Sequence, residues 1–146
     1  MSLAEELSAR VGETVGVGSW VTITQEQIDQ FAEATGDHQW IHVDADRAKQ
    51  GPFGTTIAHG FLTLSLVAAI APSVDVGEVR MAVNYGLDRV RFISPVPVGS
   101  RLRAHTVLKD AAAVAGGVQV KTEVTLELEG SDKPACVAET LVRYYP

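Results

Sequence analysis

The sequence predicts an α+β fold in which a curved, antiparallel, five-stranded sheet wraps around one central, buried helix. The first observation behind this prediction is segment 61–71, which is apolar on nearly every side, as is typical of a helix that is buried all round. The second is that most of the chain beyond it alternates apolar and polar residues, which is the period of a β-strand. A sheet that curves around the helix is the simplest architecture that buries such a helix.

Length and composition indicate a soluble globular protein. A chain of 146 residues is expected to form one domain over residues 1–146. The net charge of −6 argues against a nucleic-acid partner, because phosphate binding needs clustered lysines and arginines. The single cysteine, Cys136, excludes an internal disulfide, and the acidic N-terminus lacks the basic region of a signal peptide. The longest apolar run is shorter than the ~20 residues that span a bilayer, so we expect a cytoplasmic protein without a membrane partner.

The first elements are expected to be a strand and a helix. Residues 15–23 are rich in Val, Ile, Thr and Trp, which favours a strand. Thr24 and Gln27 have the spacing of a capping box, so a helix is expected to begin there. Gly36 is expected to end this helix in the left-handed conformation. Asp37 would then begin a loop.

The segment between this helix and the apolar segment is expected to be irregular. Residues 37–57 show no sustained period, although Asp44 could cap a short helical turn that continues to Gln50. Pro72 is expected to end the helix formed by residues 61–71.

Four strands are expected in the second half of the chain, and their charges suggest how they pair. The strand over residues 83–92 changes parity near Asp88 and Arg89, which predicts a bulge there. A strand from residue 101 to 109 and another from 118 to 128 would form a hairpin through a turn ending in two glycines. The last strand covers 136–145. The strand arginines are interpreted as partners of the strand glutamates rather than as ligand-binding groups. These arginines are Arg89, Arg91, Arg101 and Arg103.

Asp37 and His42 are the candidate catalytic residues. A carboxylate and an imidazole five positions apart on a loop can converge on one water molecule, and both groups exchange protons near neutral pH. The structural alternative is an aspartate that only caps a turn and a histidine that is merely partly buried. The long irregular segment that follows favours the catalytic interpretation, because such segments frequently carry function.

Gly60 is the candidate oxyanion-binding residue. Its backbone N–H would be a free donor at the start of the apolar helix, where the helix dipole also favours negative charge. Its structural alternative is a tight turn or close packing. His59 could orient a ligand, but a structural role in holding the turn is favoured.

The remaining reactive side chains favour neither a metal site nor a nucleophile. Cys136 fits a core thiol, and His38 and His105 fit surface positions. A metal site built from His38, His42 and His59 would need the first two on one helix face, whereas both are expected in a loop. We therefore predict no metal.

Two motifs of the chain resemble the MaoC-like hydratase/dehydratase family, within the group of (R)-specific enoyl-CoA hydratases. The family signature has the form G-D-x-N-P-apolar-H, and Gly36, Asp37, Ile41 and His42 occupy its outer positions. The family's A-H-G segment resembles residues 58–60. Further similarity covers residues 84–92 and 95–99, so that it extends over most of the chain in the same order.

This resemblance implies a hot-dog fold and a lyase reaction of fatty acid metabolism: reversible hydration of trans-2-enoyl-CoA to (R)-3-hydroxyacyl-CoA without metal or redox cofactor. It implies that Asp37 and His42 activate the water and that the Gly60 N–H polarises the thioester carbonyl. It also implies a homodimer whose sheets join edge to edge, with acyl-CoA entering near the interface. Gln39 and Trp40 replace the family's Asn-Pro; Gln39 can make similar amide hydrogen bonds, and Trp40 is expected to narrow or line the acyl pocket.

Two other functions remain open at this point. A hot-dog acyl-CoA thioesterase would share the fold, but such enzymes often carry a carboxylate on or beside the central helix, and residues 61–71 contain none. A non-catalytic acyl-binding subunit of a larger complex would be expected to have lost the acid–histidine pair, which is complete here.

Overall fold

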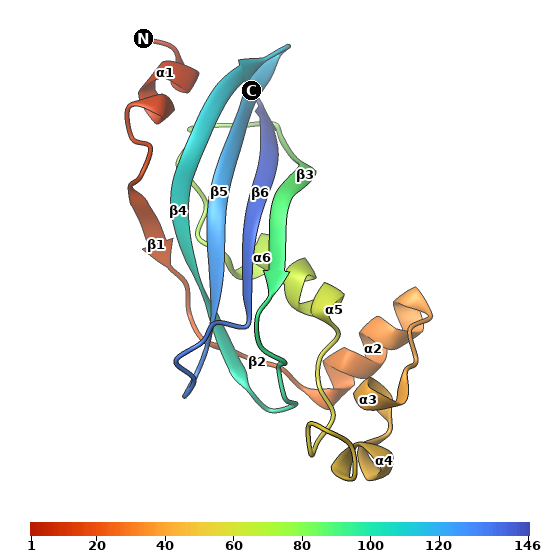
Figure 1. The fold of residues 1–146 in the computed structure, drawn as a ribbon. Coiled ribbons are helices and arrows are strands. Elements are labelled where there is room, and N and C mark those ends of the chain that lie inside the picture. Colours follow the sequence, from red (N-terminus) through yellow and green to blue (C-terminus); the bar gives the residue numbers. More distant parts are fainter.

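The computed structural model describes residues 1–146 and contains one antiparallel sheet (Figure 1). Most of the helices lie along one face of the sheet and at one end, whereas the first helix lies at the other end, near both termini. Five strands follow each other across the sheet, and a short sixth one also pairs with the second of them. In spatial order these are β1 (Thr14–Val17), β4 (Arg101–Val114), β5 (Gly117–Leu128), β6 (Cys136–Tyr145) and β3 (Met81–Phe92), with β2 (Val21–Thr22) beside β4. The predicted fold class is confirmed.

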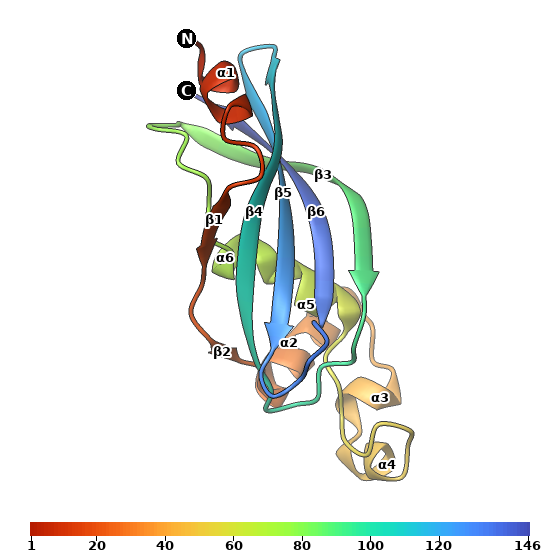
Figure 2. The same ribbon diagram turned by 60° about the vertical axis from the view of Figure 1, so that its left-hand side comes forward.

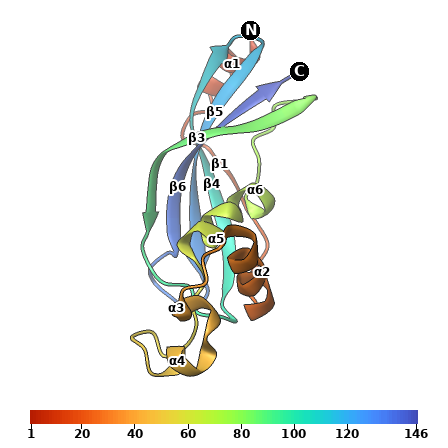
Figure 3. The same ribbon diagram turned by 90° about the vertical axis from the view of Figure 1, so that its right-hand side faces the viewer.

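Six helices accompany the sheet, and they are distributed unequally between the two ends of the molecule. The helices are α1 (Leu3–Ser8), α2 (Gln25–Thr35), α3 (Trp40–Val43), α4 (Ala45–Lys49), α5 (Gly60–Ser65) and α6 (Val67–Ile70). Helices α3 and α4 lie at the end of the molecule far from both termini (Figure 2). Helices α2, α5 and α6 lie together on one side of the sheet (Figure 3). None of the helices has the length and apolar character that crossing a bilayer requires.

The apolar segment forms a helix, but the prediction that it is buried all round is wrong for this chain. A turn at Leu66 separates α5 from α6, and only one face of the pair is buried, through Leu62, Thr63 and Val67. On the other face Phe61 is 69% exposed. The reason is geometric: the sheet of one chain covers only one side of the helix. Helix α6 ends at Ile70, before Pro72, as predicted.

Helix α2 begins and ends at the predicted residues. The Thr24 side chain accepts a hydrogen bond from the Gln27 backbone N–H at 3.1 Å, although the reciprocal bond of a full capping box is absent. Gly36 has φ of 83° and its N–H bonds to the Ala32 carbonyl. Asp37 therefore begins a loop, as predicted.

Some boundaries differ from the predictions. The single strand predicted over residues 15–23 is two strands, β1 and β2, with residues 18–20 between them. At Gly18 the backbone passes so close to α6 that a Cβ atom would lie 2.6 Å from the Ile70 carbonyl oxygen. Helix α4 is the predicted turn capped by Asp44, whereas α1 and α3 were not predicted. The capping box of Ser2 and Glu5 is the sequence signal for α1.

The predicted alternation is confirmed by burial for β4 and β5, whereas β3 is exposed at almost every position. The apolar positions of β4 and β5 face a core that also includes side chains from α2 and α5, among them Ile28, Leu62, Leu102, Val124 and Leu126. Strand β3 has two register shifts against β6, one of them between Leu87 and Arg89, where the bulge was predicted. Cys136 is a buried thiol, as predicted, and burial raises its pKa to about 11.

The predicted pairing of arginines with glutamates holds for one strand only. Arg101 pairs with Glu129, and Arg103 pairs with Glu127 across β4 and β5. Arg89 and Arg91 form no ion pair, so their predicted pairing is wrong. Both lie on β3 beside β6, where Arg91 is opposite Val137. Arg89 is opposite Glu139, but the carboxylate of Glu139 lies near Lys121 instead, at 3.9 Å.

Candidate active site

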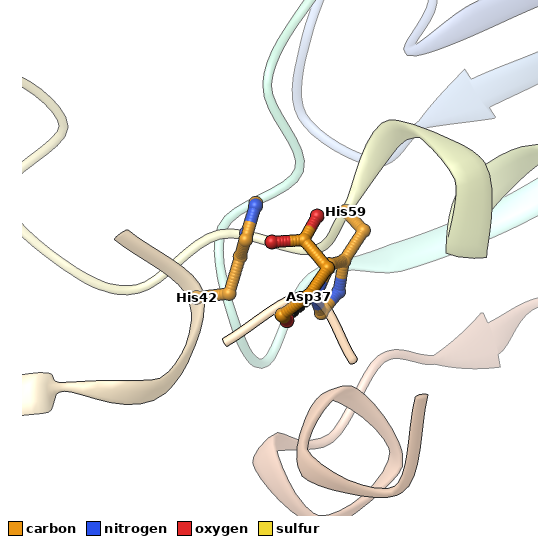
Figure 4. A group of neighbouring side chains, drawn as sticks. All are labelled: Asp37, His42 and His59. Carbon is orange, nitrogen blue, oxygen red and sulfur yellow. Dashed lines mark hydrogen bonds between the residues drawn. The ribbon is translucent and has the colours of Figure 1, made fainter. Parts of the chain in front are cut away.

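Three side chains from separate segments meet beside the start of α5. They are Asp37, which follows α2, His42 on α3, and His59, which precedes α5 (Figure 4). One ligand atom from each, a carboxylate oxygen or an imidazole nitrogen, lies within 4.8 Å of those of the other two. The structure thus brings the two predicted catalytic residues together and adds a second histidine to them.

Asp37 presents an exposed carboxylate to this cluster. The left-handed Gly36 turns the chain out of α2, and one carboxylate oxygen then accepts a hydrogen bond from the Gln39 N–H at 3.3 Å. Its backbone carbonyl accepts a hydrogen bond from His59 at 3.0 Å. The residue is fixed through its main chain, and its carboxylate remains accessible to a ligand.

His42 has a defined tautomer. Its Nδ1 lies 2.7 Å from the Ile57 carbonyl oxygen, and because a carbonyl can only accept, Nδ1 carries the proton. In the neutral ring Nε2 is therefore a free base. Burial lowers the pKa of His42, and this outweighs the bond to Ile57, which raises it; nearby His59 lowers the pKa further. The side chain is neutral and basic at neutral pH.

His59 is packed against His42 and is almost completely buried, at 2% exposure. The two imidazoles are stacked, with ring centroids 3.9 Å apart and planes inclined by 23°. The Nε2–H of His59 donates to the Asp37 carbonyl, while its Nδ1 has no partner. His59 therefore links the segment before α5 to the loop that carries Asp37, which is the structural role that its position predicts.

Gly60 is the first residue of α5 and follows His59 directly. Its N–H has no acceptor within the chain, because the first backbone donors of a helix lack intrahelical partners. A Cβ atom at this position would lie 3.2 Å from the Phe92 ring. The close ring favours glycine, whereas any residue except proline would offer the free donor.

Gln39 and Trp40 lie at the start of α3, outside the cluster. The side chain of Gln39 is exposed and does not cap the helix. Trp40 packs on Gly51, and the Arg47 guanidinium lies 4.4 Å from its ring centroid. The ring thus joins α3 to α4, and it does not line the apolar cavity described below.

The cluster also has the donor set of a metal site, but in a different combination from the one considered in the sequence. His38 lies at the surface, 3.5 Å from Glu33, and Asp37 takes its place beside His42 and His59. Two imidazoles and a carboxylate suit zinc or iron. However, a metal would have to lie near the planes of both rings at once, whereas the two rings are stacked with centroids 3.9 Å apart and planes inclined by 23°. The arrangement favours proton transfer over chelation.

One cavity of the molecule lies beside the end of α5, the helix whose start borders this cluster. Its volume is about 550 Å³, it lies between α5–α6 and strands β3, β5 and β6, and most of its lining is apolar. Leu64 and Ser65 contribute to it from the last turn of α5, the helix that begins at Gly60. Asp37, His42 and His59 do not line it. A polar cluster and an apolar cavity therefore lie along one short helix.

Comparisons with known proteins identify the family and the fold of the chain. Residues 6–129 match the family model described as MaoC like domain. The chain is 57% identical to 3-hydroxyacyl-thioester dehydratase Z of Mycobacterium tuberculosis, over 95% of this chain and 93% of that protein. It is 47% identical to Nodulation protein N of Rhizobium leguminosarum bv. viciae, over 100% of this chain and 94% of that protein. The solved (R)-hydratase from A. caviae shares its fold, with a TM-score of 0.74, 21% identity and coverage of 93% and 96% of the two chains.

Proposed function

Since the chain belongs to the MaoC-like family of dehydratases and hydratases, we propose that it is an (R)-specific enoyl-CoA hydratase. It adds water to a trans-2-enoyl-CoA and, in reverse, removes water from an (R)-3-hydroxyacyl-CoA. The observation that carries this proposal is the exposed Asp37 carboxylate beside the free Nε2 of a neutral, buried His42. A hydration needs a group that takes a proton from water and a group that holds the water in place, and this pair supplies both.

In the proposed hydration, Asp37 and His42 hold one water molecule over the double bond. The Nε2 of His42 accepts a proton from this water as its oxygen forms a bond to C3 of the substrate. The pair then returns one proton to C2, so that the elements of water are added and no charge is left behind. The bond from Nδ1–H to the Ile57 carbonyl supports this role, because it keeps the ring in the tautomer with a basic Nε2.

Gly60 is proposed to stabilise the negative charge that develops on the thioester oxygen. When water adds to C3, electron density moves through C2 onto the carbonyl oxygen. The unpaired Gly60 N–H can donate to this oxygen, and removal of one such donor typically costs about 2.7–4 kcal/mol of barrier. The neighbouring His59 fixes the start of α5 and so fixes this donor.

The acyl chain is proposed to occupy the apolar cavity. Leu64 and Ser65 follow Gly60 by about one helical turn, or about 6–8 Å along α5, so a chain whose carbonyl binds at Gly60 reaches the cavity within a few carbons. The volume of about 550 Å³ lies in the range of small-molecule pockets. Rates with short, medium and long enoyl-CoAs would measure how much of it a substrate fills.

The direct test uses purified protein and crotonyl-CoA. Hydration removes the conjugated enoyl-thioester absorbance, and chiral analysis of the product should give the (R)-3-hydroxyacyl-CoA. Release of free thiol, assayed in parallel, would identify a thioesterase instead. Helices α5 and α6 contain no carboxylate, which counts against that alternative. Binding of acyl-CoA without either reaction would support a non-catalytic subunit and contradict the proposal.

The pH dependence of hydration should follow His42. Its pKa lies below the ordinary value of 6.5, and only the neutral ring can accept a proton. We therefore expect kcat/KM to be constant near neutral pH and to fall only when the pH drops below 6.5. The free energy of unfolding should also fall below pH 6.5, because His42 binds a proton more tightly in the unfolded chain than in the folded one. An ascending limb of kcat/KM above pH 7 in steady-state assays would contradict the assignment of His42 as the base.

We also propose that the enzyme is a homodimer that pairs through β3. This strand lies at the edge of the sheet and carries exposed apolar side chains, among them Met81, Val83, Tyr85 and Leu87. Long exposed apolar edges invite pairing with another strand. The double substitution Val83→Lys/Leu87→Lys should convert a dimer into a monomer in sedimentation velocity, whereas Glu26→Lys on exposed α2 should not. A wild-type chain that sediments as a monomer at micromolar concentration would contradict this proposal.

A further inference from the structure

The main chain of His42 is held by a part-buried hydrogen-bond network that sequence patterns do not indicate. From it we infer that Gln25, together with Thr56, is a positioning residue for the catalytic imidazole. This inference rests on the proposed function, since it concerns the same base. Neither side chain belongs to the cluster of Asp37, His42 and His59.

Gln25 is the first residue of α2, and all the polar atoms of its side chain are engaged. Its Nε2 donates to the His42 carbonyl oxygen at 2.8 Å and to Asp29 Oδ1 at 2.9 Å. Its Oε1 accepts a hydrogen bond from the Thr56 hydroxyl at 2.6 Å. The orientation of the amide follows from these partners, because the His42 carbonyl can only accept. Gln25 therefore connects α2, α3 and the segment before α5.

Thr56 connects the same network to the imidazole ring. It is 2% exposed, and the next residue, Ile57, provides the carbonyl that accepts the His42 Nδ1–H at 2.7 Å. The Ile57 N–H bonds in turn to the Ile41 carbonyl at 3.0 Å. Val98 N–H donates to the Thr56 carbonyl at 2.9 Å, so the segment is anchored to the chain beyond β3. The main chain of His42 and its ring are thus fixed from two sides by residues that bond to each other.

Loss of this network should act on catalysis through the position of Nε2. Without the Gln25 amide, the His42 carbonyl and the Thr56 hydroxyl both lose a partner in a part-buried region, and the short helix α3 loses its tie to α2. A displacement of about 1 Å at a catalytic group can lower a rate as much as 10²-fold. Because Gln25 does not belong to the catalytic cluster, we expect kcat to fall while KM changes little.

Two substitutions of similar volume test this inference in the full-length protein. Gln25→Met and Thr56→Val should each lower kcat for crotonyl-CoA hydration by roughly 10-fold or more, with KM within about twofold. The double variant should lose little more than either single one, because the two residues act as one unit. Thr56→Ser retains the hydroxyl and should recover most of the loss. Gln30→Met, on the exposed face of the same helix, is the matched control and should leave kcat unchanged.

An NMR measurement separates this inference from the proposed reaction. The hydrogen-bonded Nδ1 proton of His42 should give a low-field resonance that disappears in His42→Gln. This resonance should broaden or shift in Gln25→Met and Thr56→Val but not in Gln30→Met, whatever reaction the enzyme catalyses. If wild type lacks hydratase activity while the resonance responds as expected, the proposed function fails and the positioning role stands. If both folded variants keep the wild-type resonance and full kcat, Gln25 and Thr56 do not position His42.

Discussion

Replacement of His42 with glutamine is expected to lower kcat for enoyl-CoA hydration by at least about 10². Glutamine retains a polar side chain of similar reach, with its amide near the position of the imidazole Nε2. It cannot accept a proton at neutral pH, whereas the free Nε2 of His42 can. The loss therefore reports proton transfer rather than collapse of the site.

The effect of His42→Gln is measured as the single-turnover or steady-state rate of crotonyl-CoA hydration. Thermal unfolding of the variant confirms that it is folded. His105→Gln is the matched control, because His105 lies on the sheet, where its Nε2 is 2.6 Å from a Glu127 carboxylate oxygen and remote from the cluster. That variant should keep the wild-type rate. A folded His42→Gln enzyme with a near-wild-type rate would show that the imidazole is not the base.

Replacement of Asp37 with asparagine is expected to lower the same rate by at least about 10². Asparagine has the same shape, and its amide oxygen can still accept the hydrogen bond from the Gln39 N–H. What disappears is the negative charge and the capacity to take up or release a proton. Because the Asp37 main chain also holds His59 through its carbonyl, and asparagine preserves that carbonyl, the stacked histidines should remain in place.

The rate of Asp37→Asn is measured with the same crotonyl-CoA assay. Asp132→Asn, on an exposed bend, provides the control. The unfolding temperature of Asp37→Asn should stay close to that of wild type, because the carboxylate is exposed and makes only one hydrogen bond. If this variant hydrates crotonyl-CoA at nearly the full rate, the carboxylate only terminates α2, which is the structural alternative.

Local patterns predicted those parts of the fold that depend on near neighbours in the chain. The end of α2 at Gly36 follows from the backbone freedom of glycine, and the buried faces of β4 and β5 follow from their alternation. The bulge near Asp88 follows from the change of parity in β3. Each of these depends on residues only a few positions apart, so the sequence carries the information directly.

Long-range geometry caused the wrong predictions. Segment 61–71 was expected to be buried all round, but the sheet covers one face, and the apolar character of Phe61 does not reveal what covers the other. Arg89 and Arg91 were expected to meet glutamates, but Arg91 is opposite Val137 on β6, and the Glu139 opposite Arg89 lies near Lys121 instead. Strand order and the covered faces of a helix are set by packing between distant segments, which the period of a sequence does not encode.

The candidate site divides in the same way. The sequence by itself determined the chemical groups: an acid released from a helix by Gly36, a histidine five residues later, and a glycine that leaves a backbone donor free. Only the tertiary structure decided that His59 stacks on His42 and that Ile57 fixes the tautomer. The physical reason is that residue type limits which proton transfers are possible, whereas the pKa, tautomer and direction of each group are set by partners that folding brings from other parts of the chain.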